Sequence, residues 1–233
     1  MTYDSDGRLT NVTAGTSPLV SYAYNDATGD TVATMPGGVT QTTSIDAAGR
    51  PAKVTGAKGT TVVTQSTYQL DPNGNPTAIT GANGVTDTYS YDSASRLTAV
   101  CYATATCTGA TSYIKWTYNG DGNQLSESRP AGTTNYTYNS SGQLASKSGA
   151  SGSATYTHDP DGNVTGDGTN NYTWNAAGQL VSAGGSKPTT YAYDGDNRRI
   201  SITNGSKVIK PVWDPSSGQL AAETDGAGNT LRS

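Results

Sequence analysis

One short motif recurs along the whole chain and constrains its fold more than any other feature. An anchor residue, usually aromatic, is followed by Asp or Asn and, about four residues later, by Gly. The clearest copies, residues 136–144 and 172–180, share the pattern Tyr-Thr-aromatic-Asn-x-x-Gly-Gln-Leu. Self-similarity at a near-constant period indicates a repeat architecture. Eleven anchors lie 16 to 27 residues apart, at Tyr3, Tyr24, Ile45, Leu70, Tyr91, Tyr118, Tyr138, His158, Trp174, Tyr193 and Trp213.

Each part of the motif has a mechanical reason. Residues two apart on a strand share a face, so Tyr22 and Tyr24 project together and the residue between them points the other way. Asp suits the first position of a type I turn, Pro the second and Gly the fourth, as in residues 71–74 and 159–162. A type I turn followed by a left-handed Gly makes a bulged hairpin. We therefore predict one hairpin per unit, with an apolar residue returning to the core two positions after the Gly, as at Leu9, Leu144, Val164 and Leu180.

Composition excludes the main alternatives to an all-β fold. The 233 residues include two Glu and seven Lys, too few of the strong helix formers for a helical bundle. A mean hydropathy of −0.56 is compatible with disorder. Disordered chains, however, combine low hydrophobicity with high net charge and few aromatics, whereas this chain has a net charge of −4, 15 Tyr and 3 Trp. We predict an all-β chain of short strands and Gly/Asn/Asp turns.

Some repeats depart from the motif, and the backbone conformation of the turn limits which residues can replace the Gly. Asn197 replaces the turn Gly and tolerates the left-handed region, which Ser95 does less readily. Extra residues lengthen the turns at 25–29 and 214–218. No linker or charge run marks a domain boundary. We expect residues 1–233 to form a single array of about eleven hairpin units.

Isolated hairpins are only marginally stable, so the units must stack into one long curved or spiralling antiparallel sheet. Aromatic anchors of neighbouring units would then support one another, with an open edge at each end. Unpaired edges invite association with another chain, so self-association into oligomers or fibres is one expected behaviour.

Charge and hydropathy limit the partners. With an isoelectric point near 4.8 and no Lys/Arg cluster, the chain lacks the positive patch that nucleic acids or anionic membranes require. No apolar run approaches the ~18 residues of a membrane span or the core of a signal peptide. Because residues 1–4 begin inside the repeat pattern, we interpret the chain as a segment of a longer protein.

The unit Tyr-Asp-x-x-Gly-Arg-Leu, present at residues 3–9 and nearly again at 91–97, resembles the YD repeat of bacterial Rhs proteins. Related repeats occur in insecticidal toxin-complex subunits, wall-associated proteins of Gram-positive bacteria and animal teneurins. The resemblance covers essentially the whole chain. It implies a ribbon of hairpins that spirals into a hollow shell, often around a C-terminal toxin domain. Family members that cleave themselves do so in a core after the repeats, which this chain does not include, so no cleavage residue is carried over.

The resemblance predicts a non-enzymatic scaffold in a secreted or surface bacterial protein, with the flanking repeats and toxin domain of the parent chain as partners. About 22 strands at ~4.8 Å each make a ribbon of about 105 Å, too short to enclose a folded domain by itself. The chain is therefore expected to be a wall segment of a shell. Two alternatives are a cell-surface module that recognises glycans or proteins, and a fibre that assembles by edge pairing.

Cys101 and Cys107 lie in an insertion between repeats. In a secreted protein a close, even pair favours a local disulfide that closes a loop, with free buried thiols as the alternative. Zinc would need further ligands, and the chain has 1 His. His158 occupies an anchor position, which favours a stand-in for Tyr over a catalytic base.

The remaining motifs have simple structural explanations. Asp-x-Asp-Gly turns resemble fragments of calcium loops, but an EF-hand needs a twelfth-position Glu and flanking helices. Trp116, Trp174 and Trp213 fall in repeat register, which favours packing over glycan stacking. Asn-x-Ser/Thr matches at Asn11, Asn135, Asn163 and Asn171 follow from composition. There is no nucleophile elbow or phosphate loop. We expect no catalytic, cofactor-binding or metal-binding residue, and no cofactor.

Overall fold

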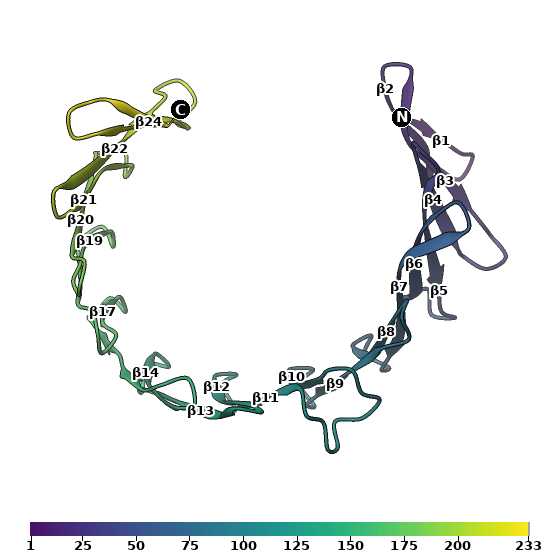
Figure 1. The fold of residues 1–233 in the computed structure, drawn as a ribbon, viewed down its shortest axis with the longest axis horizontal. Coiled ribbons are helices and arrows are strands. Elements are labelled where there is room, and N and C mark those ends of the chain that lie inside the picture. The colour runs from purple at the N-terminus through teal and green to yellow at the C-terminus, as the bar shows by residue number, and fades with distance from the viewer. Residues whose placement is uncertain (233) are drawn as a thin grey trace. The chain divides into compact units, whose positions relative to one another are not determined.

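The computed structural model describes residues 1–232, and over that range every regular element is a β-strand (Figure 1). The strands form three antiparallel sheets, β1 to β15, β16 with β17, and β18 to β24, each in chain order. Sequential order without crossovers is what a row of hairpins produces, because each strand pairs with its predecessor and its successor. The all-β prediction of side-by-side antiparallel hairpins is confirmed.

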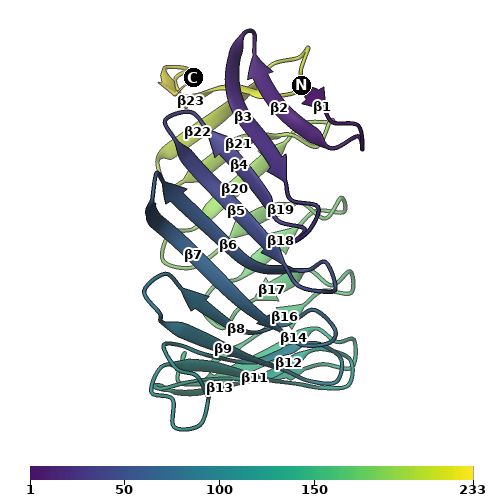
Figure 2. The same cartoon turned by 90° about the vertical axis from the view of Figure 1, so that its right-hand side faces the viewer.

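By its contacts the chain divides into two compact units, residues 1–118 with 126–132, and residues 119–125 with 133–233. In the first unit, long neighbouring strands lie side by side (Figure 2). The first twelve strands are β1 (Thr2–Tyr3), β2 (Leu9–Ala14), β3 (Ser17–Tyr24), β4 (Thr31–Met35), β5 (Val39–Ile45), β6 (Pro51–Lys58), β7 (Thr61–Leu70), β8 (Pro76–Gly81), β9 (Thr86–Tyr91), β10 (Leu97–Cys101), β11 (Tyr113–Tyr118) and β12 (Gln124–Arg129).

The second unit repeats the scheme with shorter strands in its middle. Its strands, with β13 beginning at the last residue of the first unit, are β13 (Gly132–Tyr138), β14 (Leu144–Gly149), β15 (Ala154–Thr155), β16 (Thr157–His158), β17 (Val164–Gly166), β18 (Tyr172–Trp174), β19 (Leu180–Ala183), β20 (Thr189–Tyr193), β21 (Arg199–Asn204), β22 (Lys207–Trp213), β23 (Leu220–Asp225) and β24 (Thr230–Arg232).

All eleven sequence anchors are the last residue of a strand. Each anchor is followed by the predicted turn. Where that turn has the regular length, the register of the strand pairing shifts at the anchor. Tyr138, for example, pairs with Leu144 across a bulge. Ser95 and Asn197 have φ of 58° and 65°, so both take the left-handed conformation of the Gly they replace. The predicted bulged hairpin is confirmed.

The ladder is interrupted around the shortest repeat. Only 16 residues separate His158 from Trp174, so β16, β17 and β18 have two or three residues each. Two weaker links cross the interruptions, a hydrogen bond of 2.8 Å from the Tyr156 N–H to the Ala145 carbonyl and an isolated bridge between Gly166 and Asn171. The sequence predicts one uninterrupted sheet. In the structure, the strand pairing is instead interrupted around the shortest repeat.

Few side chains are fully enclosed, because the hairpins form a single layer. Among the described residues, those that are buried are Ala78, Ala99, Val100, Cys101, Thr134, Gly166 and Pro211. The apolar residues predicted to return after the turn, Leu9, Leu144, Val164 and Leu180, are half-buried, as are the three Trp side chains, whereas Leu220 is exposed. Stability must therefore come from contacts between adjacent repeats more than from a deep core.

Candidate functional site: the joints between repeats

The first residue of each turn organises the turn through its side chain. In the first repeat, Asp4 Oδ1 accepts hydrogen bonds from the Asp6 and Arg8 N–H groups at 3.0 and 2.8 Å. The Arg8 Nε donates to Asp4 Oδ2 at 2.8 Å. The Arg8 backbone N–H, followed by its guanidinium, lowers the pKa of Asp4. The turn is thus closed by an ionised carboxylate that holds both backbone and side chain.

The turn residue and its partner four positions later change together along the chain. Asp pairs with Arg or Asn, both of which present N–H donors to the carboxylate. Asn pairs with Gln in two turns, where the Asn amide donates to the Gln oxygen, whereas Asn119 Oδ1 accepts from the Asn123 N–H. The pairs are Asp4–Arg8, Asp46–Arg50, Asp92–Arg96, Asp194–Arg198, Asp71–Asn75, Asp159–Asn163, Asp225–Asn229, Asn139–Gln143 and Asn175–Gln179.

The polar tip of an aromatic anchor binds the main chain of the preceding repeat. In each case the acceptor is the carbonyl of the residue two positions after the turn Gly, or after the residue that replaces it. Tyr hydroxyls and Trp indole N–H groups both serve as donors. The bonds are Tyr24 to Leu9 at 2.9 Å, Tyr118 to Leu97 at 2.8 Å, Tyr138 to Gln124 at 2.8 Å, Trp174 to Val164 at 2.8 Å, Tyr193 to Leu180 at 2.9 Å and Trp213 to Arg199 at 2.9 Å.

We call this bond, from the polar tip of an anchor to a main-chain carbonyl of the preceding repeat, the joint between two repeats. It explains a feature of composition that sequence reasoning left unused. The chain has 15 Tyr and 3 Trp but 0 Phe. A Phe ring would pack in the same place but has no donor for the carbonyl, and an unpaired carbonyl away from water costs free energy. The absence of Phe was the available signal for an anchor that must donate as well as pack.

Two anchors without a donor use different joints. Ile45 lies against the preceding turn, where a Cβ on Gly29 would overlap its side chain. At the Leu70 anchor the direction of the bond is reversed, because Arg50 of the preceding repeat donates from Nη1 to the Asp71 carbonyl at 2.8 Å. The Ile45 and Leu70 repeats therefore keep a contact with the preceding repeat by other means.

Arg side chains reinforce the joint from the preceding turn. The Arg8 guanidinium lies 4.6 Å from the centre of the Tyr24 ring, and that of Arg96 lies 4.8 Å from the Tyr118 ring. Arg8 also pairs with Asp26 of the next turn. Hydrogen bonding to Asp26, then to Asp4, raises the pKa of Arg8. Cation–π contacts of this kind contribute ~0.5–1 kcal/mol at exposed sites.

The opposite face of the sheet carries a second, hydroxyl-rich ladder. Where a Thr lies between the two aromatic positions, it points away from the anchors, as predicted, and bonds to a hydroxyl on the paired strand. Examples are Thr117 with Ser126 at 2.6 Å, Thr137 with Ser146 at 2.7 Å and Thr173 with Ser182 at 2.7 Å. The two faces thus differ in chemistry, one aromatic and one polar.

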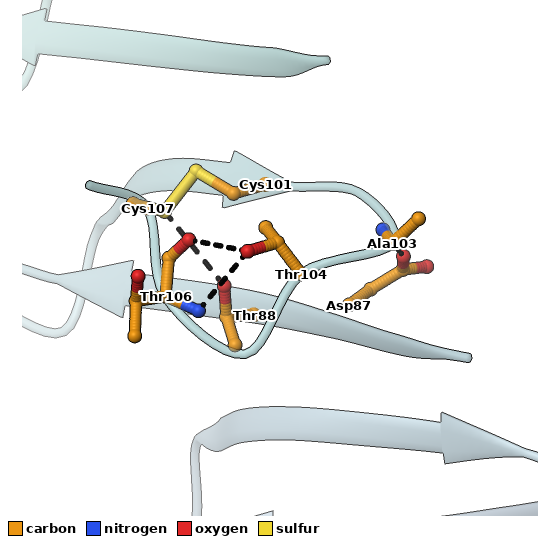
Figure 3. Close-up of a disulfide and its surroundings, with 7 residues drawn as sticks. All are labelled: Asp87, Thr88, Cys101, Ala103, Thr104, Thr106 and Cys107. Atoms are coloured by element: carbon orange, nitrogen blue, oxygen red, sulfur yellow. Dashed lines mark hydrogen bonds between the residues drawn. A yellow bond between two sulfur atoms is a disulfide. The ribbon is translucent and has the colours of Figure 1, made fainter. Parts of the chain in front are cut away.

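The favoured local disulfide is present between Cys101 and Cys107 (Figure 3). Cys101 is fully buried. It pairs with Thr88, and the Thr88 hydroxyl lies 3.8 Å from the Cys107 sulfur. The loop also bonds to β9 through its backbone, with the Ala103 N–H donating to Asp87 Oδ1 at 2.8 Å. The insertion is therefore folded back against β9 and is closed covalently by the bridge to Cys101.

Other positions singled out in the sequence remain isolated from one another. His158 ends β16 in anchor register, paired with Val164. Trp116 donates to Glu127 at 3.3 Å, and Trp174 and Trp213 serve as anchors. In residues 1–232 no group of three or more His, Cys, Asp or Glu side chains is placed to hold a metal ion, and no helix is long and apolar enough to cross a membrane. That the chain has no catalytic or ligand-binding residue stays a prediction.

Comparison with known proteins agrees with this architecture. Residues 46–86 match the RHS Repeat family. No curated protein matches. Among solved structures, the chain is similar to the Photorhabdus luminescens Tc holotoxin pore at 18% identity and a TM-score of 0.52, covering 97% of this chain and 14% of that one. It also resembles the TcdB2-TccC3-TEV structure at 16% identity and a TM-score of 0.50, covering 99% of this chain and 15% of that one.

A row of bulged hairpins, joined through aromatic tips and preceding carbonyls, defines a structural β-repeat protein. Residues 73–208, more than half of the chain, match the Teneurin YD-shell family. The chain belongs to that family. It spans about 15% of the length of the similar solved chains.

Proposed function

We propose that residues 1–233 form a single array of about eleven hairpin units that serves as a non-enzymatic wall segment of a YD-repeat shell. The observation that carries the proposal is the joint, since six aromatic anchors bond to the main chain of the repeat before them. A wall needs support along its length, and this contact supplies it at six of the eleven repeats. Membership of the shell family and the similarity to Tc toxin structures support the assignment.

The shell encloses a toxin or other cargo domain of a longer parent protein, which is secreted or displayed on a bacterial surface. The disulfide supports an oxidising compartment, because cytosolic thiols are kept reduced. The wall acts by geometry, since a hydrogen-bonded sheet separates an enclosed volume from solvent. No reaction is assigned to the segment itself.

Protease protection tests containment. The product of the parent gene, with an epitope tag on the domain that follows the repeats, is treated with protease before and after the shell is unfolded by denaturant. We expect the tagged domain to survive only while the shell is folded. Digestion of the domain at the same rate in both states, or a parent gene with nothing to enclose, would overturn containment. Concentration-dependent filaments seen by light scattering and electron microscopy would replace the wall by a self-assembling fibre.

A further inference from the structure

The shortest repeat creates a cleft on the anchor face of the second unit. It has a volume of about 410 Å³ and is lined by Tyr156, Val164, Asp167, Tyr172, Trp174 and Leu180. That volume is within the ~300–1,000 Å³ typical of small-molecule sites. Its walls are thus three aromatic rings, two aliphatic side chains and one carboxylate, and none of the described residues lining it is Lys, Arg or His.

The carboxylate in the cleft is held in its ionised form. Asp167 Oδ2 accepts a hydrogen bond of 2.7 Å from the Tyr172 hydroxyl and one of 3.1 Å from the Asn170 amide. Asp167 Oδ1 accepts from the N–H groups of Thr169 and Asn170 at 2.9 and 2.7 Å. The Tyr172 hydroxyl, followed by the Asn170 and Thr169 donors, lowers the pKa of Asp167. The cleft therefore carries a negative charge with no cation among its lining residues.

The same bonds decide which ligand the cleft suits. Four donors occupy the carboxylate, so little acceptor capacity is left for the hydroxyl groups of a sugar. The Trp174 N–H is also occupied, by the Val164 carbonyl at 2.8 Å. What remains for a ligand is aromatic surface and uncompensated negative charge. A quaternary ammonium group needs both and has no hydrogen-bonding group that would go unpaired.

We propose that the cleft of Tyr156, Tyr172, Trp174 and Asp167 binds a quaternary ammonium group, such as the head of choline. The ring faces attract the cation through their quadrupoles, Val164 and Leu180 contact its methyl groups, and the carboxylate supplies the opposite charge. This binding is additional to the scaffold role and does not depend on it.

A related cleft in the first unit shows why the short repeat is special. It has a volume of about 590 Å³ and is lined by Arg50, Pro51, Val54, Tyr68, Leu70 and Gly74. Pro51, Tyr68 and Leu70 hold the repeat positions that Val164, Tyr172 and Trp174 hold in the second unit. The anchor is aliphatic and Arg50 adds a positive charge, so this cleft repels a cation. Both clefts are apolar, but only one has the charge and rings for quaternary ammonium.

Titration calorimetry of the 233-residue chain tests the proposal with choline chloride and with 3,3-dimethylbutan-1-ol, in which carbon replaces the charged nitrogen. We expect saturable binding of choline and at least tenfold weaker binding of the alcohol, as two or more cation–π contacts of ~1 kcal/mol would produce. Equal binding of the two compounds would reduce the site to a plain apolar cleft and overturn the proposal. So would tighter binding of a methyl glycoside, or no saturable binding of choline.

Variants locate the site without disturbing the joints. Tyr156 makes no hydrogen bond through its hydroxyl and is not an anchor, so Tyr156→Phe should leave choline affinity unchanged and Tyr156→Leu should weaken it several-fold. Tyr22→Leu, at the equivalent position of a repeat in the first unit, is the matched control and should have no effect. Equal losses in Tyr156→Leu and Tyr22→Leu would place any binding elsewhere and overturn the assignment. Melting curves of each variant verify that the fold is retained.

Discussion

The Tyr24 hydroxyl donates a hydrogen bond of 2.9 Å to the carbonyl of Leu9, which lies one repeat earlier. The same relationship recurs at five further anchors, so an interaction across a repeat boundary is built from a side chain and a backbone atom. A backbone acceptor does not depend on which residue occupies its position. Leu, Gln, Val and Arg all provide it, and the repeats can therefore diverge in sequence while keeping the joint.

Removing that donor should cost stability at this one position. Tyr24→Phe keeps the ring beneath Arg8 but leaves the Leu9 carbonyl without its partner, so we expect a loss of about 0.5–1.5 kcal/mol in the free energy of unfolding. Tyr22→Phe is the matched control, because the Tyr22 hydroxyl makes no hydrogen bond, and it should change stability by less than ~0.5 kcal/mol. Urea denaturation of both variants makes the comparison. Equal losses would show that the hydroxyl bond contributes nothing.

The sequence predicted the local structure of each repeat but not the contacts between repeats. The anchors, turns and hairpins followed from residues a few positions apart, because strand alternation and turn chemistry are local. The Tyr24–Leu9 bond did not, because it depends on the register between two repeats. Such register is fixed by packing and by turns at the other end of the hairpin. The absence of Phe was an available signal that sequence reasoning did not use, and the acceptor could be found only from coordinates.

The second unit shows the same limit. The spacing between His158 and Trp174 marked a short repeat, yet the pattern did not indicate that the ladder would break there. No sequence motif marked Asp167, and its proximity to Tyr172 and Trp174 was not foreseen. Shortening a hairpin brings its far loop toward the anchors, and that is a consequence of geometry and not of residue type.

A Gly at the strained Ser95 position should stabilise the array. Ser95 has a φ of 58°, a conformation that costs an ordinary residue ~1–2 kcal/mol. Ser95→Gly should therefore raise the free energy of unfolding by about 0.5–1 kcal/mol, after loss of the 3.3 Å contact from Asn75 to the Ser95 hydroxyl. The measurement is the thermal midpoint.

The reverse change provides the control for that prediction. Gly142 has a φ of 75° with open space around it, so Gly142→Ala introduces backbone strain alone and should destabilise by about 1 kcal/mol. Gly149→Ala should cost more, since its Cβ would overlap the Thr133 carbonyl oxygen. If Ser95→Gly lowers the midpoint, strain at this turn is not what limits stability.

Reduction of the disulfide should destabilise the insertion that it closes without unfolding the rest of the array. Cys101 and Cys107 are six residues apart, and closing so short a loop contributes about 2 kcal/mol. We expect reductant to lower the melting temperature and to speed hydrogen exchange at the Ala103 N–H, which bonds to Asp87. Exchange in the Tyr24 repeat is the internal control and should not change. An unchanged melting temperature would contradict a stabilising role for the disulfide.

Acid should weaken the turns, because the carboxylates that close them act as ionised acceptors. Hydrogen bonds to the turn Asp residues lower their pKa values, and for Asp214 the Ser216 hydroxyl and N–H lower the pKa to about 2. A carboxyl group with a lowered folded-state pKa contributes stability that is fully present above its unfolded pKa of ~3.9 and is lost as the pH falls through the folded value.

The thermal midpoint should therefore be constant above about pH 5 and fall between about pH 4 and 2. Carboxyl chemical shifts followed by NMR identify the groups responsible, and Asp214 should titrate near the bottom of that window. A midpoint that stays level down to pH 2, or a turn Asp that titrates at ~3.9, would show that the turns do not depend on charge.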